Sequence, residues 1–235
     1  MKIAVMQPYI FPYFGYFQLI NAVDKFVVFD DVNYINKGWI NRNQLLINNA
    51  PSLFTIPLQK ASQNKHINEI NLSLDDKWKS KLLKTIESAY KKAPMYSAVY
   101  PIIVDVVENK EGNLSNYLAH GIRVICEYLG IETEIVSSSS QYNTFELKGE
   151  EKIFSICMQE NANMYINPIG GLDLYKKDTF SDKNISLKFL KTGNIVYKQF
   201  KDPFIPYLSI IDVLMFNSVE ECLNLLSQYS LVENE

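Results

Sequence analysis

Two short segments near the N-terminus gather the side chains best suited to bind a ligand. The first, residues 6–16, reads Met-Gln-Pro-Tyr-Ile-Phe-Pro-Tyr-Phe-Gly-Tyr and follows a short apolar run. The second, residues 37–43, reads Lys-Gly-Trp-Ile-Asn-Arg-Asn. Both combine aromatic rings, turn residues and hydrogen-bonding side chains, and both are expected in the first loops of an α/β protein. Such loops commonly carry the ligand site.

The first segment has the layout of a phosphate-binding loop. A strand leads into the loop, and a helix then points its positive N-terminus and free N–H groups toward it, which favours an anion. This layout resembles the class I nucleotidylyltransferase fold, with Tyr13 and Tyr16 where that fold has histidines. Tyrosine cannot supply imidazolium charge near neutral pH, so we expect binding rather than the usual adenylyl transfer. The candidate nucleotide-binding residues are Gln7, Tyr9, Tyr13, Gly15 and Tyr16.

The second segment follows a pair of carboxylates. Asp30 and Asp31 end an apolar run, and a strand-end carboxylate can act as a general base. Asp30 and His66 are therefore the candidate catalytic residues. Cationic and polar side chains nearby would orient charged groups of a substrate; with Asp31, the binding candidates here are Lys37, Trp39, Asn41, Arg42 and Asn43. The alternative is an acidic turn followed by a solvated basic loop.

The bulk properties exclude several classes of protein. The chain has 235 residues, 47% of them apolar and 21% charged, which is typical of a globular protein. A net charge of −3 disfavours a nucleic-acid-binding protein. No apolar stretch is long enough for a membrane span, and the first residues do not resemble a signal sequence, so we expect a cytoplasmic location.

Cysteines and histidines give little support to a metal site. The three cysteines are far apart, at Cys126, Cys157 and Cys222, and we interpret them as buried thiols. The two histidines form no zinc motif, so we predict no metal site, although Asp30 and Asp31 leave Mg²⁺ open. The pattern identifies no cofactor.

Alternating apolar patterns predict an α/β order of elements. We expect strands at 2–6 and 25–29 around a helix at 15–23, which is a right-handed crossover with a parallel strand pair. Three β-like runs at 40–47, 53–57 and 67–72 would extend this sheet or form an insertion beside it. Predicted helices follow from Asp75–Asp76 to Pro94 and from Asn113 to Gly130.

The remaining third of the chain resumes the alternation. The pattern predicts a strand at 132–136, a helix at 150–160, a strand at 164–167, a hairpin from 185–190 and 195–197, and two helices within 208–229. We therefore expect a single α/β domain over residues 1–235. Its Rossmann-like parallel-sheet core would occupy 1–136, with helical elaboration and a C-terminal α/β portion at 142–235.

Several motifs along the chain resemble the WbqC-like protein family. They are Met-Gln-Pro-Tyr at 6–9 with Pro12 and Gly15, the Asp30–Asp31 pair, Gly-Trp-Ile-Asn-Arg-Asn at 38–43, and Pro-Tyr-Leu-Ser-Ile-Ile-Asp-Val-Leu at 206–214. Members of that family are associated with bacterial O-antigen, the polysaccharide of lipopolysaccharide, and with other surface-polysaccharide loci. The resemblance implies work on activated sugars in the cytoplasm.

These observations lead to one main functional hypothesis and two alternatives. The main hypothesis is a transferase that modifies a nucleotide-linked amino sugar, for instance by N-acylation, with the sugar nucleotide and an acyl donor as partners. The first alternative is a nucleotidylyl- or glycosyltransferase on the same frame. The second is a non-catalytic protein that binds sugar nucleotides or serves as an assembly protein. The sequence indicates neither the sugar nor the oligomeric state.

Overall fold

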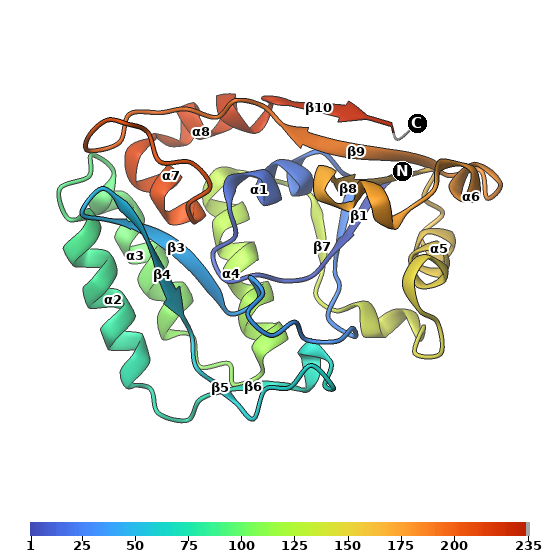
Figure 1. The fold of residues 1–235 in the computed structure, drawn as a ribbon, viewed down its shortest axis with the longest axis horizontal. Coiled ribbons are helices and arrows are strands. Elements are labelled where there is room, and N and C mark those ends of the chain that lie inside the picture. The colour runs from blue at the N-terminus through green and yellow to red at the C-terminus, as the bar shows by residue number, and fades with distance from the viewer. Residues whose placement is uncertain (234–235) are drawn as a thin grey trace.

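A six-stranded sheet forms the centre of the molecule (Figure 1). The structure, a computed structural model, describes residues 1–233. The sheet order is β10-β9-β8-β1-β2-β7. The bounds are β1 (Lys2–Met6), β2 (Lys25–Val28), β7 (Glu134–Val136), β8 (Met164–Pro168), β9 (Ser186–Thr192) and β10 (Tyr229–Val232). All neighbours pair in parallel except β10, which is antiparallel to β9.

The strand order indicates where a sheet of this kind is expected to bind a ligand. From β1 the chain adds β2 and β7 on one side, and it then crosses to add β8 and β9 on the other. This is a doubly wound arrangement whose order reverses between β1 and β8, and ligands bind beyond the carboxyl ends of the strands at such a point. The predicted α/β class with a parallel core is confirmed.

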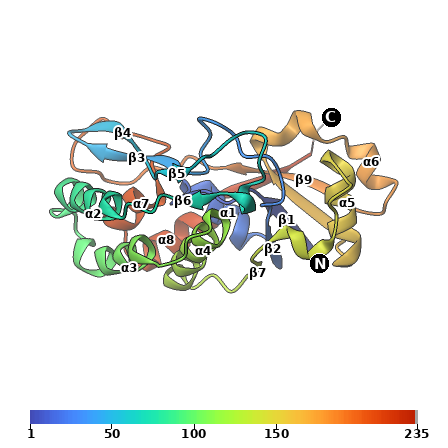
Figure 2. The same cartoon turned by 90° about the horizontal axis from the view of Figure 1, so that it is seen from below.

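Helices cover both faces of the sheet (Figures 1 and 2). One face carries α1 (Phe14–Asn21), α4 (Leu114–Leu129) and α8 (Val219–Leu226), with α2 (Lys77–Tyr90), α3 (Tyr96–Glu108) and α7 (Ile210–Phe216) packed outside them. The other face carries α5 (Gly149–Gln159) and α6 (Lys177–Ser181). Side chains alternate along each strand, so Ala4 and Phe26 join the first core while Ile3 and Val27 join the second.

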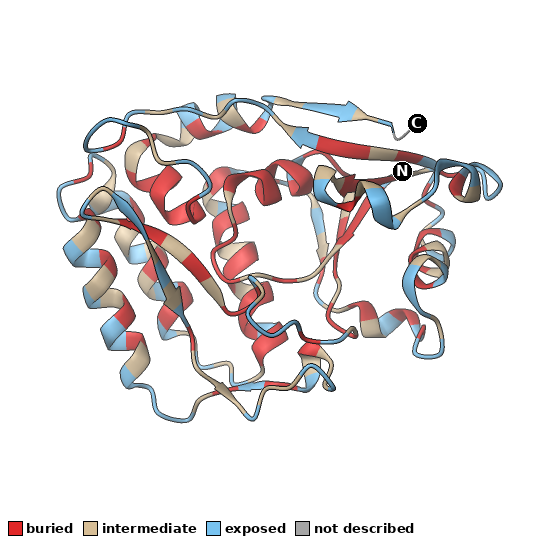
Figure 3. Cartoon of the chain, viewed as in Figure 1, coloured by how far each residue is buried: buried red, intermediate tan, exposed pale blue. Residues whose placement is uncertain are grey.

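The segment between β2 and α2 is an insertion beside the sheet. Its hairpin β3 (Arg42–Ile47) and β4 (Ala50–Thr55) and its short pair β5 (Leu58–Gln59) and β6 (Asn71–Leu72) form separate two-stranded sheets. Of the β-like run predicted at 67–72, the first half is the 3₁₀ turn η1 (Ile67–Glu69), and its end is the strand β6. Figure 3 shows that the outer strand β4 is largely exposed, whereas α1 and α4 are buried.

The C-terminal part departs most from the sequence-based prediction. The predicted hairpin from 185–190 and 195–197 is wrong, because β9 pairs with β8 on one side and with the terminal strand β10 on the other. The two predicted terminal helices are present as α7 and α8, but β10 follows them. The 3₁₀ turns η2 (Ser139–Tyr142) and η3 (Ile169–Leu174) follow β7 and β8.

Candidate functional site

A pocket of about 520 Å³ lies at the carboxyl end of β9, beside the N-terminus of α1. We call it the edge pocket. Its volume is in the range of small-molecule sites. Its lining is mostly aromatic and aliphatic with a few polar groups: Tyr13, Phe14, Gly15, Ile169, Lys191, Thr192, Gly193, Asn194, Ile195, Tyr197, Phe204, Pro206, Tyr207, Leu208 and Val213.

The N-terminus of α1 contributes positive electrostatic potential to this pocket. Tyr13 is the N-cap residue, its side chain makes no capping hydrogen bond, and the first turn has no acidic residue. Tyr16 N donates to the carbonyl of Tyr13 (3.0 Å), so the N–H groups of Phe14 and Gly15 are the first-turn donors without a partner in the helix. Together with the helix dipole they favour an anion.

Gly15 allows the close approach of α1 to β9. A Cβ atom at this position would lie 2.5 Å from Thr192 Oγ1 and 2.5 Å from Tyr13 Cε2. Any larger residue must therefore displace the groups that line the pocket. The sequence prediction that Gly15 belongs to the binding loop remains a prediction, but the structure places Gly15 at the pocket wall.

The end of β9 contributes the polar groups that the sequence analysis missed. Lys191, Thr192 and Asn194 line the pocket opposite α1. The analysis placed these residues near the turn of a local hairpin. The available signal was the break Thr-Gly-Asn after an apolar run, which in a parallel strand marks the end where ligands bind.

A buried carboxylate holds the loop that forms the outer wall. Asp212 is 0% exposed and accepts hydrogen bonds from Tyr90 Oη (2.9 Å), Tyr197 Oη (2.6 Å) and Gln199 Nε2 (2.7 Å). Gln199 also bonds both backbone groups of Ile205. Burial raises the pKa of Asp212 against the opposing effect of these three donors. Asp212 thereby fixes the segment that carries Tyr197 and Phe204.

Aromatic rings give the edge pocket a surface for a flat or ring-shaped ligand. The rings of Tyr197 and Phe204 pack edge to face with centroids 5.0 Å apart. Burial raises the pKa of Tyr13, so its hydroxyl is protonated at neutral pH and can donate a hydrogen bond. The pocket thus combines stacking surfaces, hydroxyl donors and an anion-binding end.

The other predicted residues of the first loop include Tyr9 and Tyr16, which pack inside the loop rather than in the edge pocket. Tyr16 is 1% exposed, and its hydroxyl donates to the carbonyl of Gln7 (3.0 Å). Tyr9 packs on Tyr16 with ring centroids 5.7 Å apart, and burial, followed by the proximity of Tyr13, raises the pKa of Tyr9 to about 12. Among the five candidates in this loop, only Tyr13 and Gly15 line the edge pocket.

Asp30 and Asp31 lie beyond the end of β2 in a network of hydroxyl groups. Asp30 is 1% exposed and accepts hydrogen bonds from Ser115 Oγ (2.6 Å), Ser138 Oγ (2.8 Å) and Ser139 N (3.1 Å). Burial raises the pKa of Asp30, and the bonds from Ser115 and Ser138 oppose the rise. None of these serines was among the site residues predicted from the sequence.

Asp31 forms a buried ion pair. Its Oδ2 lies 2.7 Å from Lys152 Nζ, and both side chains are almost completely buried. Lys152 also donates to the backbone carbonyl of Asp31 (2.9 Å). This geometry gives Asp31 a role in attaching α5 to the end of β2.

His66 lies across a β-bridge from Asn33, in the segment that pairs with the residues after Asp31. His66 caps η1 in a reciprocal arrangement with Glu69, whose Oε2 accepts from His66 N (2.7 Å). The two catalytic candidates, Asp30 and His66, therefore lie on neighbouring segments, but neither lines the edge pocket. Their catalytic role remains a prediction.

The motif at 41–43 lies at the start of strand β3, and its side chains point alternately to the two sides of the strand. Asn41 accepts from Tyr34 Oη (2.7 Å), and Asn43 donates to the carbonyls of Ile10 (3.2 Å) and Phe11 (2.7 Å). Both asparagines are buried. Asn43 fastens the insertion to the first loop, whereas Asn41 bonds within the insertion.

Arg42 points away from these buried asparagines. Its guanidinium lies 5.8 Å from the ring centre of Trp39, which is 48% exposed, and its Nε donates to the carbonyl of Gly38. Lys37 is exposed in the same loop. These three cationic and aromatic residues form a surface site separate from the edge pocket.

Among residues 1–233, no group of three or more His, Cys, Asp or Glu side chains is placed to hold a metal ion. None of the helices in this range has both the length and the apolar character needed to cross a bilayer.

Comparison with known proteins places the chain in a sequence family. The model of the WbqC-like protein family matches residues 7–223. Rv1507c of Mycobacterium tuberculosis (strain ATCC 25618 / H37Rv), an uncharacterized protein, is 29% identical over 219 residues, which cover 92% of this chain and 93% of that protein. No solved structure matches significantly.

Proposed function

The chain belongs to the WbqC-like protein family, and on that premise we propose that it is a transferase acting on a nucleotide-linked sugar. The N-terminus of α1, Lys191 and Thr192 all line one aromatic-walled pocket, and this observation supports the proposal most strongly. The cationic end suits a diphosphate, and the rings suit a base or a sugar. From the family resemblance we further propose that this reaction belongs to the assembly of O-antigen or a related surface polysaccharide in the cytoplasm.

The ligand would extend along the carboxyl edge of the sheet. From β9 to β2 the edge crosses three strand spacings, roughly 14 Å in all. A nucleotide-linked sugar held at the edge pocket can therefore reach toward the segments that carry Asp30 and His66. There the sugar amino nitrogen would attack the acyl carbon of the donor, and Asp30 or His66 would take the proton that the nitrogen loses. The bond between the acyl carbon and its carrier breaks, and the carrier leaves with that proton.

The proposal is tested by ligand-induced stabilisation. UDP-N-acetylglucosamine and dTDP-glucose are added to the protein, and the unfolding temperature is measured against the free sugars. A ligand at a hundredfold excess over its Kd stabilises the folded state by about 2.7 kcal/mol. We expect Gly15→Val to abolish the shift, because the new side chain enters the pocket wall.

Gly112→Val is the matched control. A Cβ atom at Gly112 would meet nothing within 4 Å, so this variant should retain the shift. A panel without any shift for the parent protein, or equal shifts for the parent and Gly15→Val, would overturn the proposal.

A second candidate function is favoured by the composition of the pocket wall. Its lining residues include no His, Asp, Glu or Cys, which suits a protein that binds a sugar nucleotide without turning it over. Product formation from a bound sugar nucleotide and an acyl donor, followed by mass spectrometry, separates the two functions.

A further inference from the structure

A second hollow lies away from the edge pocket and is strongly cationic. Its volume is about 880 Å³, and it lies between the second half of α2, the turn joining β3 to β4, and residues 200–201. We call it the lysine groove. Its lining residues are Leu46, Ile47, Asn48, Asn49, Lys81, Lys84, Thr85, Ser88, Ala89, Lys91, Lys92, Phe200 and Lys201.

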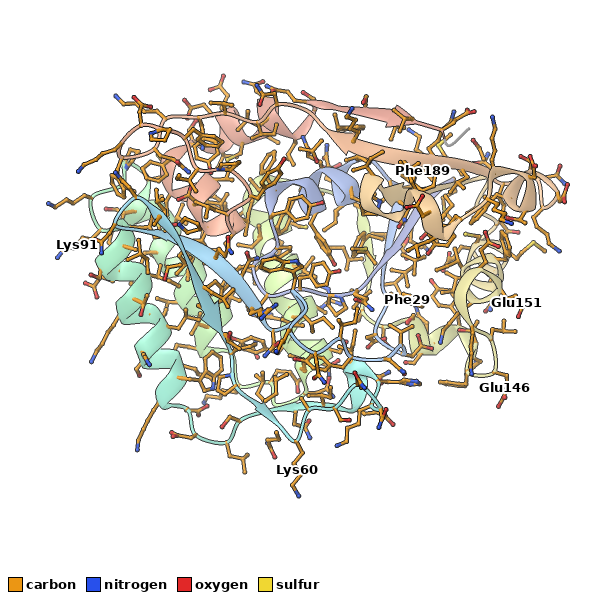
Figure 4. All side chains as sticks on the ribbon, in the orientation of Figure 1. Phe29, Lys60, Lys91, Glu146, Glu151 and Phe189 are labelled. Atoms are coloured by element: carbon orange, nitrogen blue, oxygen red, sulfur yellow. The ribbon has the colours of Figure 1, made fainter. Side chains whose placement is uncertain are left out.

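Five lysines line this groove in a protein whose net charge is −3. No Asp or Glu is among the lining residues. Within residues 1–233, the ion pairs found involve none of the five lysines. Figure 4 places Lys91 on the opposite side of the molecule from Glu146 and Glu151, so positive charge is concentrated at this end.

The sequence of α2 produces this concentration. Lys81, Lys84, Ser88 and Lys91 recur at intervals of three and four residues, so they share one face of the helix. The opposite face is buried against the core. Like charges at this spacing repel one another and destabilise the helix. A bound anion would remove that repulsion.

The facing wall adds hydrogen-bond donors and an apolar surface. Asn48 and Asn49 form the tight turn between β3 and β4, with φ values of 53° and 58°. Phe200 is 39% exposed and packs against Phe216 with ring centroids 4.7 Å apart. A ligand in the groove would therefore meet the ammonium groups of α2 on one side. On the other it would meet amides, an aromatic ring and the ammonium group of Lys201.

We propose that the lysine groove binds a small molecule carrying at least two phosphate groups. The lysines come from α2 and from the loop at Lys201, so a diphosphate or longer chain can distribute its charge among more of them than a single phosphate can. The concave shape and a volume typical of small-molecule sites favour a small ligand over a flat membrane surface or a nucleic-acid helix.

The groove and the edge pocket share one loop. Phe200 and Lys201 line the groove, and Tyr197 and Phe204 line the edge pocket. Asp212 anchors this loop through Tyr197 and Gln199. The groove would thus hold its phosphorylated ligand next to the edge pocket, but as a separate site.

Calorimetric titration tests the proposal, with inorganic pyrophosphate and ADP as probes and orthophosphate as the monophosphate comparison. We expect pyrophosphate and ADP to bind more tightly than orthophosphate. The double variant Lys84→Gln/Lys91→Gln should weaken the affinity for pyrophosphate and for ADP by about tenfold or more, because two charge-assisted hydrogen bonds are lost.

Lys77→Gln/Lys148→Gln is the charge-matched control. Both residues are exposed and neither lines the groove, so binding should change by less than about twofold. Equal weakening by both double variants, or absence of pyrophosphate and ADP binding to the parent, would overturn the proposal. Binding to anionic phospholipid vesicles without binding to either probe would also overturn it.

A further variant separates this site from the edge pocket. Gly15→Val should leave intact the pyrophosphate binding that Lys84→Gln/Lys91→Gln weakens, because Gly15 lies outside the groove. Loss of all pyrophosphate binding in Gly15→Val would assign the phosphate site to the edge pocket, which overturns the groove proposal while the proposed function stands.

Discussion

Asn43 and Ser209 donate hydrogen bonds to the same oxygen atom, the carbonyl of Phe11. Asn43 Nδ2 lies 2.7 Å and Ser209 Oγ 2.9 Å from it. Phe11 has a φ of 43°, which is uncommon for a residue with a side chain. One donor comes from β3 and the other from the cap of α7. The conformation of the first loop therefore depends on two distant parts of the chain.

This shared acceptor predicts that the two donors are energetically coupled. Ser209→Ala and Asn43→Ala should each lower the free energy of unfolding by about 1–3 kcal/mol. The double variant should lose more than the sum, by at least about 0.5 kcal/mol, because only then is the Phe11 carbonyl left without either donor. Urea unfolding of the four proteins measures the coupling.

The control replaces a serine that caps a helix without contacting the loop. Ser218 caps α8 through Glu221, and Ser218→Ala should combine additively with Asn43→Ala. Additivity of Ser209→Ala with Asn43→Ala would show that the shared bond does not couple them.

The two tyrosines of the first loop should separate binding from stability. Tyr16→Phe removes a buried hydrogen bond to Gln7 and should lower the free energy of unfolding by about 1 kcal/mol with unchanged sugar-nucleotide affinity. Tyr13→Phe should weaken binding by about 1–3 kcal/mol, since Tyr13 lines the edge pocket. Calorimetric titration and urea unfolding of both variants check this. If Tyr16→Phe weakens sugar-nucleotide binding and Tyr13→Phe does not, the binding site lies on the core side of the loop.

The ion pair between Asp31 and Lys152 should be costly to break. Lys152→Met leaves the Asp31 carboxylate buried without its cation and should destabilise the fold by about 3–5 kcal/mol. Asp31→Asn together with Lys152→Met should recover part of this loss. Thermal or urea unfolding measures both, with the exposed Lys177→Met as a control of little effect. Equal losses for the single and double variants would contradict the pairing.

Asp212 should make stability depend on pH in a defined direction. Its pKa is raised in the folded protein, so the folded state holds the proton more tightly than the unfolded state. Its contribution to stability is complete below the unfolded value of 3.8 and is lost as pH rises through the raised pKa. The free energy of unfolding is measured for the parent and for Asp212→Asn across mildly acidic pH. As pH rises, the variant should become more stable relative to the parent. A difference independent of pH would contradict the raised pKa.

Asp30 provides the test between an enzyme and a binding protein. Asp30→Asn retains one acceptor oxygen, and the serine hydroxyls around it can turn to accept from the new amide. If Asp30 is the general base, turnover should fall by about 10²–10⁴ while sugar-nucleotide affinity stays nearly constant. Unchanged turnover would leave Asp30 with a structural role only.

Local patterns in the sequence predicted the first half of the fold well. The strands at β1 and β2 and the helices α1, α2 and α4 follow from apolar spacing and end signals that lie within each segment. Helix α3 was missed, since Pro101 lies inside it and proline is normally a sign of a helix end. Strand β10 was missed because it is short and largely exposed, and its pairing with β9 is long-range.

The difference between local and long-range signals also explains which residues of the candidate site could be predicted from the sequence. Tyr13 and Gly15 could be named from the sequence because a strand, a loop and a helix follow one another there. Lys191 and Tyr197 could not, because their place in the pocket depends on β9 joining β8 rather than turning back on itself. The burial of Asp30 likewise depends on serines more than eighty residues away, whose hydroxyls are recruited only in the folded chain.

The position of β1 between β2 and β8 has a consequence for synthesis on the ribosome. β2 is available soon after β1, but β8 begins at residue 164 and β9 ends at residue 192. A nascent chain therefore carries an open edge of β1, with unpaired backbone groups, until most of the chain has emerged. Until then the edge pocket lacks one wall, and the growing chain can neither bind its ligand nor be stabilised by it. Chaperone contact during synthesis should accordingly fall on this exposed edge.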